Sequence, residues 1–464
     1  MEEKISKFRG CLIGLALGDA LGAPFEGLKA GHIKQICGEV EGFVEPEIIY
    51  KENPFKWRCS GLYTDDTQQA LAVAEALILE DDFLKETLAE IYVQLLDEGP
   101  EDLPFGLFRG AGQNFKKAVL KMKDNPEDLF FCGEPSAGNG AAMRIAPIGL
   151  FFSGDESKLR KAVIEASLMT HNDPCGISAA SAIAKAISLL ANSPIKCPIE
   201  IDNFCSDLIR FTRRTEECLQ DNYWRYLDKE KRITSVHTFS EALSILAGIL
   251  REGNDEIARS TIIKEANRHS PEFPISSANQ SYAPASVIAS LYYGLKYKNF
   301  TRGVITAIQD GKDTDTVGAM TGALLGTHLG FDSIPEEWVK KLLGSEQILL
   351  RADALATKET DYLKWVDFIE NEKELTLYEK KLRQKYIDTH SEEIERIKEK
   401  KEKKALKEAE KKEQKMQVEN LPFAPPPEVW LKKDKPTSKF EKLARSKKRI
   451  NWKETRRAKK KEKW

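Results

Sequence analysis

Apolar residues recur every three or four positions through most of the first 350 residues, and this period limits the fold more than any other feature. Segments of Ala, Leu and Ile run for a dozen residues or more, and short stretches rich in Gly, Pro or Asn separate them. This spacing places the apolar residues on one face of an α-helix, whereas a half-buried strand alternates every second residue. Because clear alternation is hard to find, the sequence predicts an all-α fold.

The segment over residues 6–22 carries one glycine per helical turn on a single face. These glycines are Gly10, Gly14, Gly18 and Gly22. A glycine inside a helix costs about 0.5–1 kcal/mol relative to alanine, so four of them indicate that another backbone packs closely against this face. Asp19 and Arg9 interrupt the segment, which favours a buried helix over a membrane dimer motif.

The charge divides the chain into an acidic body and a basic tail. From Lys381 to Trp464 there are 29 basic and 15 acidic residues, while the preceding part has 42 and 58. From about Asn371 the sequence becomes rich in Glu, Lys, Arg and Gln, a composition that cannot build an apolar core. We therefore predict a folded domain over residues 1–370, a charged helical or disordered segment over 371–420, and a Pro-rich spacer with a basic tail over 421–464.

The cysteines and the apolar runs indicate where such a chain would work. No uninterrupted apolar run reaches the roughly 18 residues that cross a bilayer, and the first nine residues lack the apolar stretch of a secretion signal. The eight Cys residues include no C-x-x-C pair, and several lie in apolar segments, as reduced core thiols do. We expect a cytoplasmic protein that has no membrane partner, no disulfides and no zinc site.

Two predicted helix starts each carry two carboxylates and a following Thr. The first reads Tyr-Thr-Asp-Asp-Thr-Gln over residues 63–68, and the second reads Gly-Lys-Asp-Thr-Asp-Thr over residues 311–316. One Asp at such a position would be explained as a helix cap, but a cap needs only one acidic residue. Four carboxylates brought together repel one another unless a cation compensates them, and oxygen ligands suit Mg²⁺, Mn²⁺ or Ca²⁺. The two segments therefore predict a site for one or two hard cations.

A loop of small residues over positions 135–147 could bind a diphosphate through its backbone N–H groups. It matches neither G-x-x-x-x-G-K-[ST] nor G-x-G-x-x-G, which disfavours a nucleoside triphosphatase and a Rossmann enzyme. Residues 170–174, Thr-His-Asn-Asp-Pro, end one predicted helix and start another. At this turn His171 is either part of a cap or a contact to a ligand.

Taken in order, these segments resemble the ADP-ribosylglycohydrolase family, which includes dinitrogenase reductase-activating glycohydrolase and the ADP-ribosyl-arginine and ADP-ribosyl-serine hydrolases. The matching segments are residues 14–26, 63–68, 136–144, 170–171 and 313–319. Each segment is short, but five of them in the family's order, spanning about residues 5 to 345, make a specific signal. The basic tail lies outside the family pattern.

The resemblance implies a compact multi-helix domain with a cleft that holds two Mg²⁺ ions, with Mn²⁺ as another candidate. It implies that the metal ligands are Thr64, Asp65, Asp66, Asp313, Asp315 and Thr316. It places Glu26 beside the bond that is cleaved. It assigns ADP-ribose binding to Gly138, Asn139, Gly140, Met143 and His171. The family usually has Gly-Gly-Asp where this chain has Gly311-Lys312-Asp313, so Lys312 is a departure beside the metal segment.

Cleavage of a glycosidic bond at the ribose passes through an oxocarbenium-like state, which carboxylates and metals can stabilise. The sequence therefore predicts a Mg²⁺-dependent hydrolase that releases ADP-ribose from an acceptor, either a protein side chain or a small molecule. Glu26 and Asp66 are the candidates for proton transfer. A metal-dependent phosphohydrolase and a non-catalytic ADP-ribose-binding protein are the alternatives. The basic tail is either a solvated extension or an anchor to RNA or another acidic partner.

Overall fold

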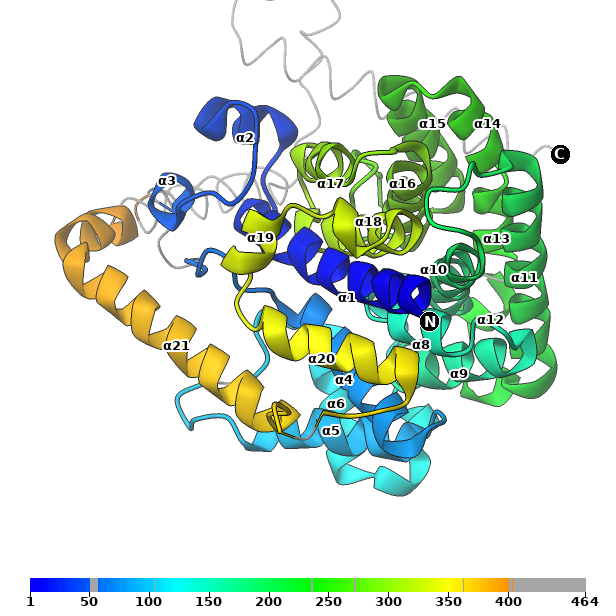
Figure 1. Ribbon diagram of the computed structural model, residues 1–464, viewed down its shortest axis with the longest axis horizontal. Helices are drawn as coiled ribbons and strands as arrows, with labels where there is room; N and C mark the ends of the chain where they lie inside the picture. The colour runs from blue at the N-terminus through cyan, green and yellow to red at the C-terminus, as the bar shows by residue number, and fades with distance from the viewer. Residues whose placement is uncertain are drawn as a thin grey trace, which may run out of the picture. The chain divides into compact units, whose positions relative to one another are not determined.

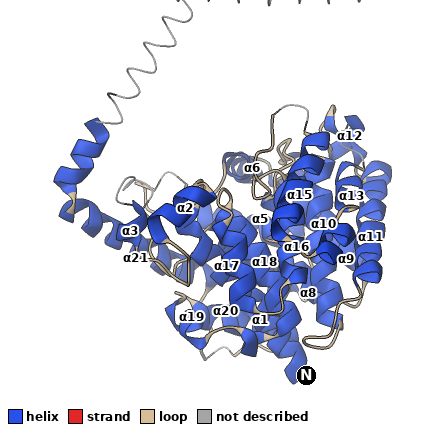
Figure 2. Cartoon of the chain, turned by 90° about the horizontal axis from the view of Figure 1, so that it is seen from above, coloured by secondary structure: helices blue, strands red, loops and turns tan. Residues whose placement is uncertain are grey.

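The computed structural model describes residues 1–50, 57–103, 105–234, 237–270, 273–361, 363–399 and 403. The chain divides into two compact units, Met1–Ile397 and Lys398–Trp464. The predicted spacer and basic tail over residues 421–464, and nearly all of 401–420, lie outside the described residues. The described part is built from helices joined by loops, with three isolated bridges and no β-strand (Figure 2). The prediction of an all-α fold is confirmed.

The helices follow one another along the whole first unit (Figure 1). The α-helices are α1 (Glu2–Gly22), α2 (Ala30–Cys37), α3 (Pro46–Tyr50), α4 (Asp65–Glu80), α5 (Lys85–Asp97), α6 (Gln113–Asp124), α7 (Gly140–Met143), α8 (Ala146–Phe151), α9 (Glu156–Leu168), α10 (Pro174–Asn192), α11 (Ile201–Asn222), α12 (Lys231–Thr234), α13 (Thr238–Leu243), α14 (Leu246–Glu252), α15 (Asp255–His269), α16 (Ala283–Lys296), α17 (Phe300–Gln309), α18 (Thr314–Leu329), α19 (Glu336–Lys341), α20 (Ser345–Thr357) and α21 (Phe368–Thr389). The short 3₁₀ helices are η1 (Ala23–Phe25), η3 (Pro126–Phe131), η4 (Trp224–Tyr226) and η5 (Phe331–Ser333).

Helices α1 and α18 lie side by side at the centre of the unit, and their contact explains the glycine face of α1 (Figure 1). A Cβ added at Gly10, Gly14 or Gly18 would overlap the carbonyl oxygen of a glycine in α18. The glycines met in this order are Gly326, Gly322 and Gly318, so the two helices run antiparallel. The expected close backbone contact is confirmed, and it brings the end of α1 to the start of α18.

Among the described residues, three segments are long and apolar enough to cross a membrane by length and composition, which differs from the expectation based on uninterrupted apolar runs. They are Glu2–Phe25, Pro174–Asn192 and Lys231–Glu252. In the first two, 89% of the apolar window is buried inside the protein, against 38% in the third. Helix α10, for example, packs against α7, α8, α9 and α11. Neighbouring helices therefore cover most of the apolar surface of the first two segments.

Helix α21 crosses the predicted domain boundary at residue 370 and packs against the body of the first unit (Figure 1). Its inward residues Glu372, Thr376 and Glu379 are buried although the helix is rich in charge. They lie four and three residues apart, a spacing that keeps side chains on one face of a helix. The helix is therefore attached by buried polar contacts as well as by the apolar Phe368, which packs in the core.

The cysteines agree with the expectation of reduced thiols. All eight are free, and those that lie buried are Cys11, Cys59, Cys132, Cys175 and Cys205. Burial raises the pKa of the Cys11 thiol to about 12, which keeps it protonated and unreactive at neutral pH.

Candidate active site

One cleft of about 370 Å³ gathers nearly every residue that the sequence singled out. It lies where the starts of α4 and α18 meet the small-residue loop before α7. The predicted residues that line it are Glu26, Asp65, Asp66, Gly138, Asn139, Gly140, Met143, His171, Asp313, Asp315 and Thr316. Thr64 is buried and does not line this cleft. Segments separated by up to 290 residues thus meet at one place.

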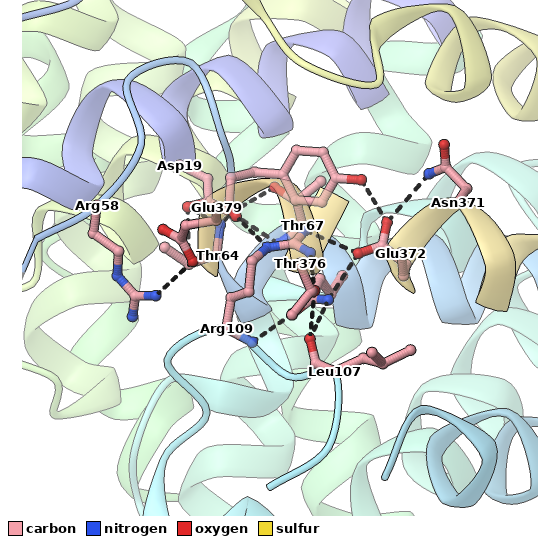
Figure 3. Close-up of polar contacts among 12 residues, drawn as sticks. Asp19, Arg58, Thr64, Thr67, Leu107, Arg109, Asn371, Glu372, Thr376 and Glu379 are labelled. Carbon is pink, nitrogen blue, oxygen red and sulfur yellow. Dashed lines mark hydrogen bonds and ion pairs between the residues drawn. The ribbon is translucent and has the colours of Figure 1, made fainter. Parts of the chain in front are cut away.

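Asp19 holds the start of α4, a role that the sequence did not reveal. Its buried carboxylate accepts hydrogen bonds from the backbone N–H of Thr64 and Thr67, each at 3.0 Å. It also accepts from the Thr64 hydroxyl at 2.8 Å and from the Thr67 hydroxyl at 2.6 Å (Figure 3). These bonds supply a cap from another helix, since Thr64 makes no side-chain cap to its own helix. The available signal was a lone Asp in an otherwise small and apolar segment.

The start of α18 is tied to the loop that carries Glu26. The backbone N–H of Gly27 donates to the Lys312 carbonyl at 2.7 Å, and the Lys312 N–H donates to the Leu28 carbonyl at 2.6 Å. Lys312 itself has φ of +69°, a left-handed conformation that favours glycine. This pairing fixes Glu26, whose side chain is exposed, at the rim of the cleft beside Asp313 and Asp315.

Crowding of carboxylates sets the electrostatics of the cleft. Burial, followed by the nearby Asp19 charge, raises the pKa of Asp65 to about 7, and Arg58 opposes this rise. Burial and the charges of Asp19 and Asp65 raise the pKa of Asp66 well above its ordinary value. Burial and the neighbouring Asp66 do the same to the pKa of Asp315. The folded chain therefore disfavours negative charge at positions where it has placed several acidic groups.

The donor set suits a hard divalent cation. The Asp66 Oδ1 atom is buried and has no hydrogen-bond partner among the described residues, which leaves one carboxylate oxygen unsatisfied. The surrounding donors are carboxylates and Thr hydroxyls, the ligands that Mg²⁺ and Mn²⁺ prefer. Over the described ranges, however, no three His, Cys, Asp or Glu side chains already converge closely enough to hold an ion. The residues fit a metal by their chemistry, but their ligand roles stay predictions.

The buried side chain of Arg144 holds the small-residue loop in place. This buried guanidinium donates to the Gly140 carbonyl at 3.2 Å and to Gln69 Oε1 at 2.8 Å. Gln69 in turn donates to Asp65 Oδ2 at 2.7 Å. The Asn139 side-chain amide donates to Asp313 Oδ2 at 2.8 Å. The loop is thus connected to both carboxylate segments, through Arg144 and Gln69, which the sequence reasoning did not identify, and through Asn139, which it did.

His171 lies against the same loop with an uncharged ring. Burial, with a smaller contribution from Arg144, lowers the pKa of His171 to about 3. Its Nδ1 atom lies 2.8 Å from the Thr170 hydroxyl. A Cβ at Gly140 would come within 3.1 Å of the imidazole, so glycine leaves room for the ring there. The neutral imidazole is therefore available for hydrogen bonding or stacking in the cleft.

On another side of α4, Glu372 of α21 binds the residues that flank Asp65 and Asp66 (Figure 3). Its carboxylate accepts from the Tyr63 hydroxyl at 2.5 Å, from the Gln68 amide at 2.7 Å and from Arg109 at 2.8 Å. The Asp65 backbone N–H also donates a hydrogen bond to the Arg109 backbone carbonyl, at 2.9 Å. Sequence reasoning missed these contacts because Glu372 lies in a segment whose composition indicates a solvated helix.

Comparisons with known proteins place most of the chain in one family. The family model described as ADP-ribosylglycohydrolase matches residues 1–363. ADP-ribosylhydrolase ARH3 of Homo sapiens is 28% identical over 366 residues, which cover 76% of this chain and 93% of that protein. The ADP-ribosyl-[dinitrogen reductase] glycohydrolase of Rhodospirillum rubrum is 24% identical over 335 residues, covering 72% of this chain and 89% of that protein.

A solved structure titled ADP-ribosylglycohydrolase-related protein complex has the same fold. It superposes with a TM-score of 0.51 at 23% sequence identity, covering 77% of this chain and 99% of that one. The matched family region ends at residue 363, before α21 begins at Phe368. The contacts of Glu372 therefore come from outside that region.

Proposed function

The chain belongs to the ADP-ribosylglycohydrolase family and is a glycosidic-bond hydrolase, and we propose that it releases ADP-ribose from an acceptor in a Mg²⁺-dependent reaction. The observation that carries the metal dependence is the unsatisfied Asp66 Oδ1 atom among carboxylates whose pKa values are raised. A divalent cation would satisfy this oxygen and remove the repulsion at once. The substrate is an ADP-ribosylated protein or a small ADP-ribosyl compound.

The two carboxylate segments would hold the metal. Asp65 and Asp66 would contribute from α4, and Asp313, Asp315 and Thr316 from α18. Thr64 is the least direct candidate, because its hydroxyl donates to Asp19. When bound, Mg²⁺ supplies Lewis-acid stabilisation for charge that develops at the ribose.

The remaining residues bind, orient and transfer protons. The Gly138–Gly140 loop would contact the diphosphate through backbone N–H groups, and neutral His171 would add a contact without placing a charge. Glu26, exposed at the rim, can give a proton to the leaving group or take one from the attacking water. Asp66 is the second candidate for proton transfer, because it lines the same cleft and because burial and the nearby Asp19 and Asp65 charges raise its pKa.

Mass spectrometry of the purified chain with ADP-ribosylated peptides tests this proposal. Arginine-linked and serine-linked peptides are incubated in parallel, each with Mg²⁺ or with EDTA. We expect free ADP-ribose and unmodified peptide in Mg²⁺ alone, and the faster linkage identifies the preferred acceptor. Release of phosphate or AMP would instead indicate a phosphohydrolase, and equal release in EDTA would contradict the metal dependence.

The basic tail and the cellular location are separate proposals. We propose that residues 421–464 add weak, salt-sensitive binding to RNA in the cytoplasm. A chain ending at Ile397 keeps α21 and the whole first unit. Filter binding at low salt should show RNA retained by the full chain and lost by the shortened one, with hydrolysis unchanged. Equal retention by both chains would assign the binding to the first unit instead.

A further inference from the structure

A second cavity of about 320 Å³ adjoins the catalytic cleft, with Glu26 and Gly110 in the lining of both. Its far wall is α21, which contributes Thr376, Glu379, Lys380 and Arg383. Because the family match ends at residue 363, this wall is formed by a part of the chain outside the matched region. The cavity thus meets the cleft at Glu26, the residue proposed to act on the leaving group.

Arg58 lies at the junction between the two spaces. A Cβ added at Gly110 would lie 2.7 Å from Arg58 Nη2 and 3.3 Å from Asp65 Oδ1, so a larger residue would fill the junction. The Arg58 side chain is only 20% exposed, yet it makes no hydrogen bond to another described residue. Its one ion pair within the described ranges joins it to Glu379, at 3.7 Å. A guanidinium has five N–H donors, so most of those on Arg58 are available to a ligand.

The charges around the cavity favour an anion. The cations that line it are Arg58, Arg109, Lys116, Lys380 and Arg383, against the carboxylates Glu26 and Glu379. Glu372 neutralises Arg109 and Asp102 pairs with Lys380. Three cations then remain for two carboxylates, and Lys116 has a ring contact to Phe105 but no carboxylate partner in the described ranges. The buried Tyr50 hydroxyl lines the same cavity and lacks a hydrogen-bond partner there.

We propose that this second cavity binds the acceptor part of the substrate, and that Arg58 selects acceptors with a carboxylate close to the modified residue. The inference rests on the proposed function, because it assumes that the leaving group is a peptide. A planar guanidinium forms two parallel hydrogen bonds with a carboxylate, which gives geometric selectivity as well as attraction. The Tyr50 hydroxyl would donate to the same group or to a neighbouring carbonyl.

Binding of unmodified product peptides tests the cavity without requiring hydrolysis. Short peptides in which two Glu or two Gln flank the acceptor residue are labelled, and their anisotropy is measured with the full chain in Mg²⁺. The Glu peptide should bind about tenfold more tightly than the Gln peptide, as one charge-assisted hydrogen bond predicts. Arg58→Gln should bring this ratio close to one, and Lys116→Gln should lower it by a smaller factor. The matched control is Lys117→Gln, an exposed neighbour outside the cavity, which should leave the ratio unchanged.

The values of kcat/KM for the ADP-ribosylated forms of the Glu and Gln peptides are then compared in the same variants. Equal binding of the two peptides, or an unchanged ratio in Arg58→Gln, would overturn the inference. Weaker binding of free ADP-ribose by Arg58→Gln, with the peptide ratio intact, would also overturn it and assign Arg58 to the nucleotide. If neither peptide is hydrolysed but the binding preference persists, the proposed function fails while the anion-binding role of the cavity stands.

Discussion

Two sets of buried carboxylates lie at the first turn of α4, and the chain treats them in opposite ways. The first is Glu372, which Figure 3 shows with its partners, and the second is the aspartate set of Asp66 and Asp315. Glu372 receives hydrogen bonds from a tyrosine, a glutamine and a buried arginine, and Arg109 balances its charge. Asp66 and Asp315 have mainly other carboxylates around them, and their pKa values are raised. In the first arrangement the charge of the carboxylate is balanced within the fold, whereas in the second it is not, which is why we propose that a cation binds there.

The largest effect is expected from neutralising the aspartate set. Asp66→Asn should lower Mg²⁺-dependent turnover about 10³-fold or more, because a metal contributes several kcal/mol to transition-state stabilisation. In EDTA the same variant should unfold at a higher temperature than wild type, since one repelling charge is gone. Thermal unfolding with and without Mg²⁺, beside an assay of ADP-ribose release, measures both effects. If Asp66→Asn kept full activity and unfolded at a lower temperature than wild type in EDTA, Asp66 would be a structural carboxylate and not a metal ligand.

Neutralising the other set should act with the opposite sign on stability. Glu372→Ala leaves Arg109 buried without its partner, which costs about 3–5 kcal/mol of unfolding free energy. Denaturant unfolding measures this loss, and Glu374→Ala, an exposed glutamate on the same helix, is the matched control. A double variant, Arg109→Leu with Glu372→Leu, should regain part of the loss because no charge is left unpaired. A loss below about 1 kcal/mol in Glu372→Ala would show that α21 contributes little to the fold.

His171 extends the comparison to a buried base beside the buried cation Arg144. Its folded pKa of about 3 lies below the ordinary value of 6.5, so its contribution to stability is complete above pH 6.5 and is lost as pH falls toward 3. Between pH 7 and pH 5, wild type should lose roughly 2 kcal/mol more than His171→Asn, at 1.36 kcal/mol per pH unit. Unfolding curves at the two pH values give this difference. An equal loss in both proteins would mean that His171 can take a proton in the folded state.

The smallest effect is expected at Lys312, the cation nearest to the aspartate set in sequence. Lys312 has no carboxylate partner in the described part of the chain, and its φ of +69° strains a side-chain-bearing residue. Lys312→Gly should raise the unfolding free energy by about 1 kcal/mol and change turnover only slightly. Calorimetry and the release assay check the two expectations. A large fall in turnover would indicate that Lys312 compensates the carboxylates after all.

Much of the fold and the site could be predicted because the signals are local. The period of apolar residues predicts the helices, and the glycine face of α1 predicts a close backbone neighbour, because both follow from geometry within one segment. The carboxylate pairs at residues 65–66 and 313–315 were visible for the same reason. Uninterrupted apolar runs were a poorer guide, since α1 is apolar on average although Asp19 and Arg9 interrupt it.

The tertiary structure alone decided which charged side chains find a partner inside the fold and which do not. Glu372 and Arg109 are 263 residues apart, and neither segment carries a mark of the other. The same holds for Asp19 beneath Thr64 and for Gln69 between Arg144 and Asp65. A sequence determines which side chains carry charge and where a helix can form. Whether a carboxylate is satisfied depends on the partners that packing brings within hydrogen-bond distance, and on how much water the packing removes.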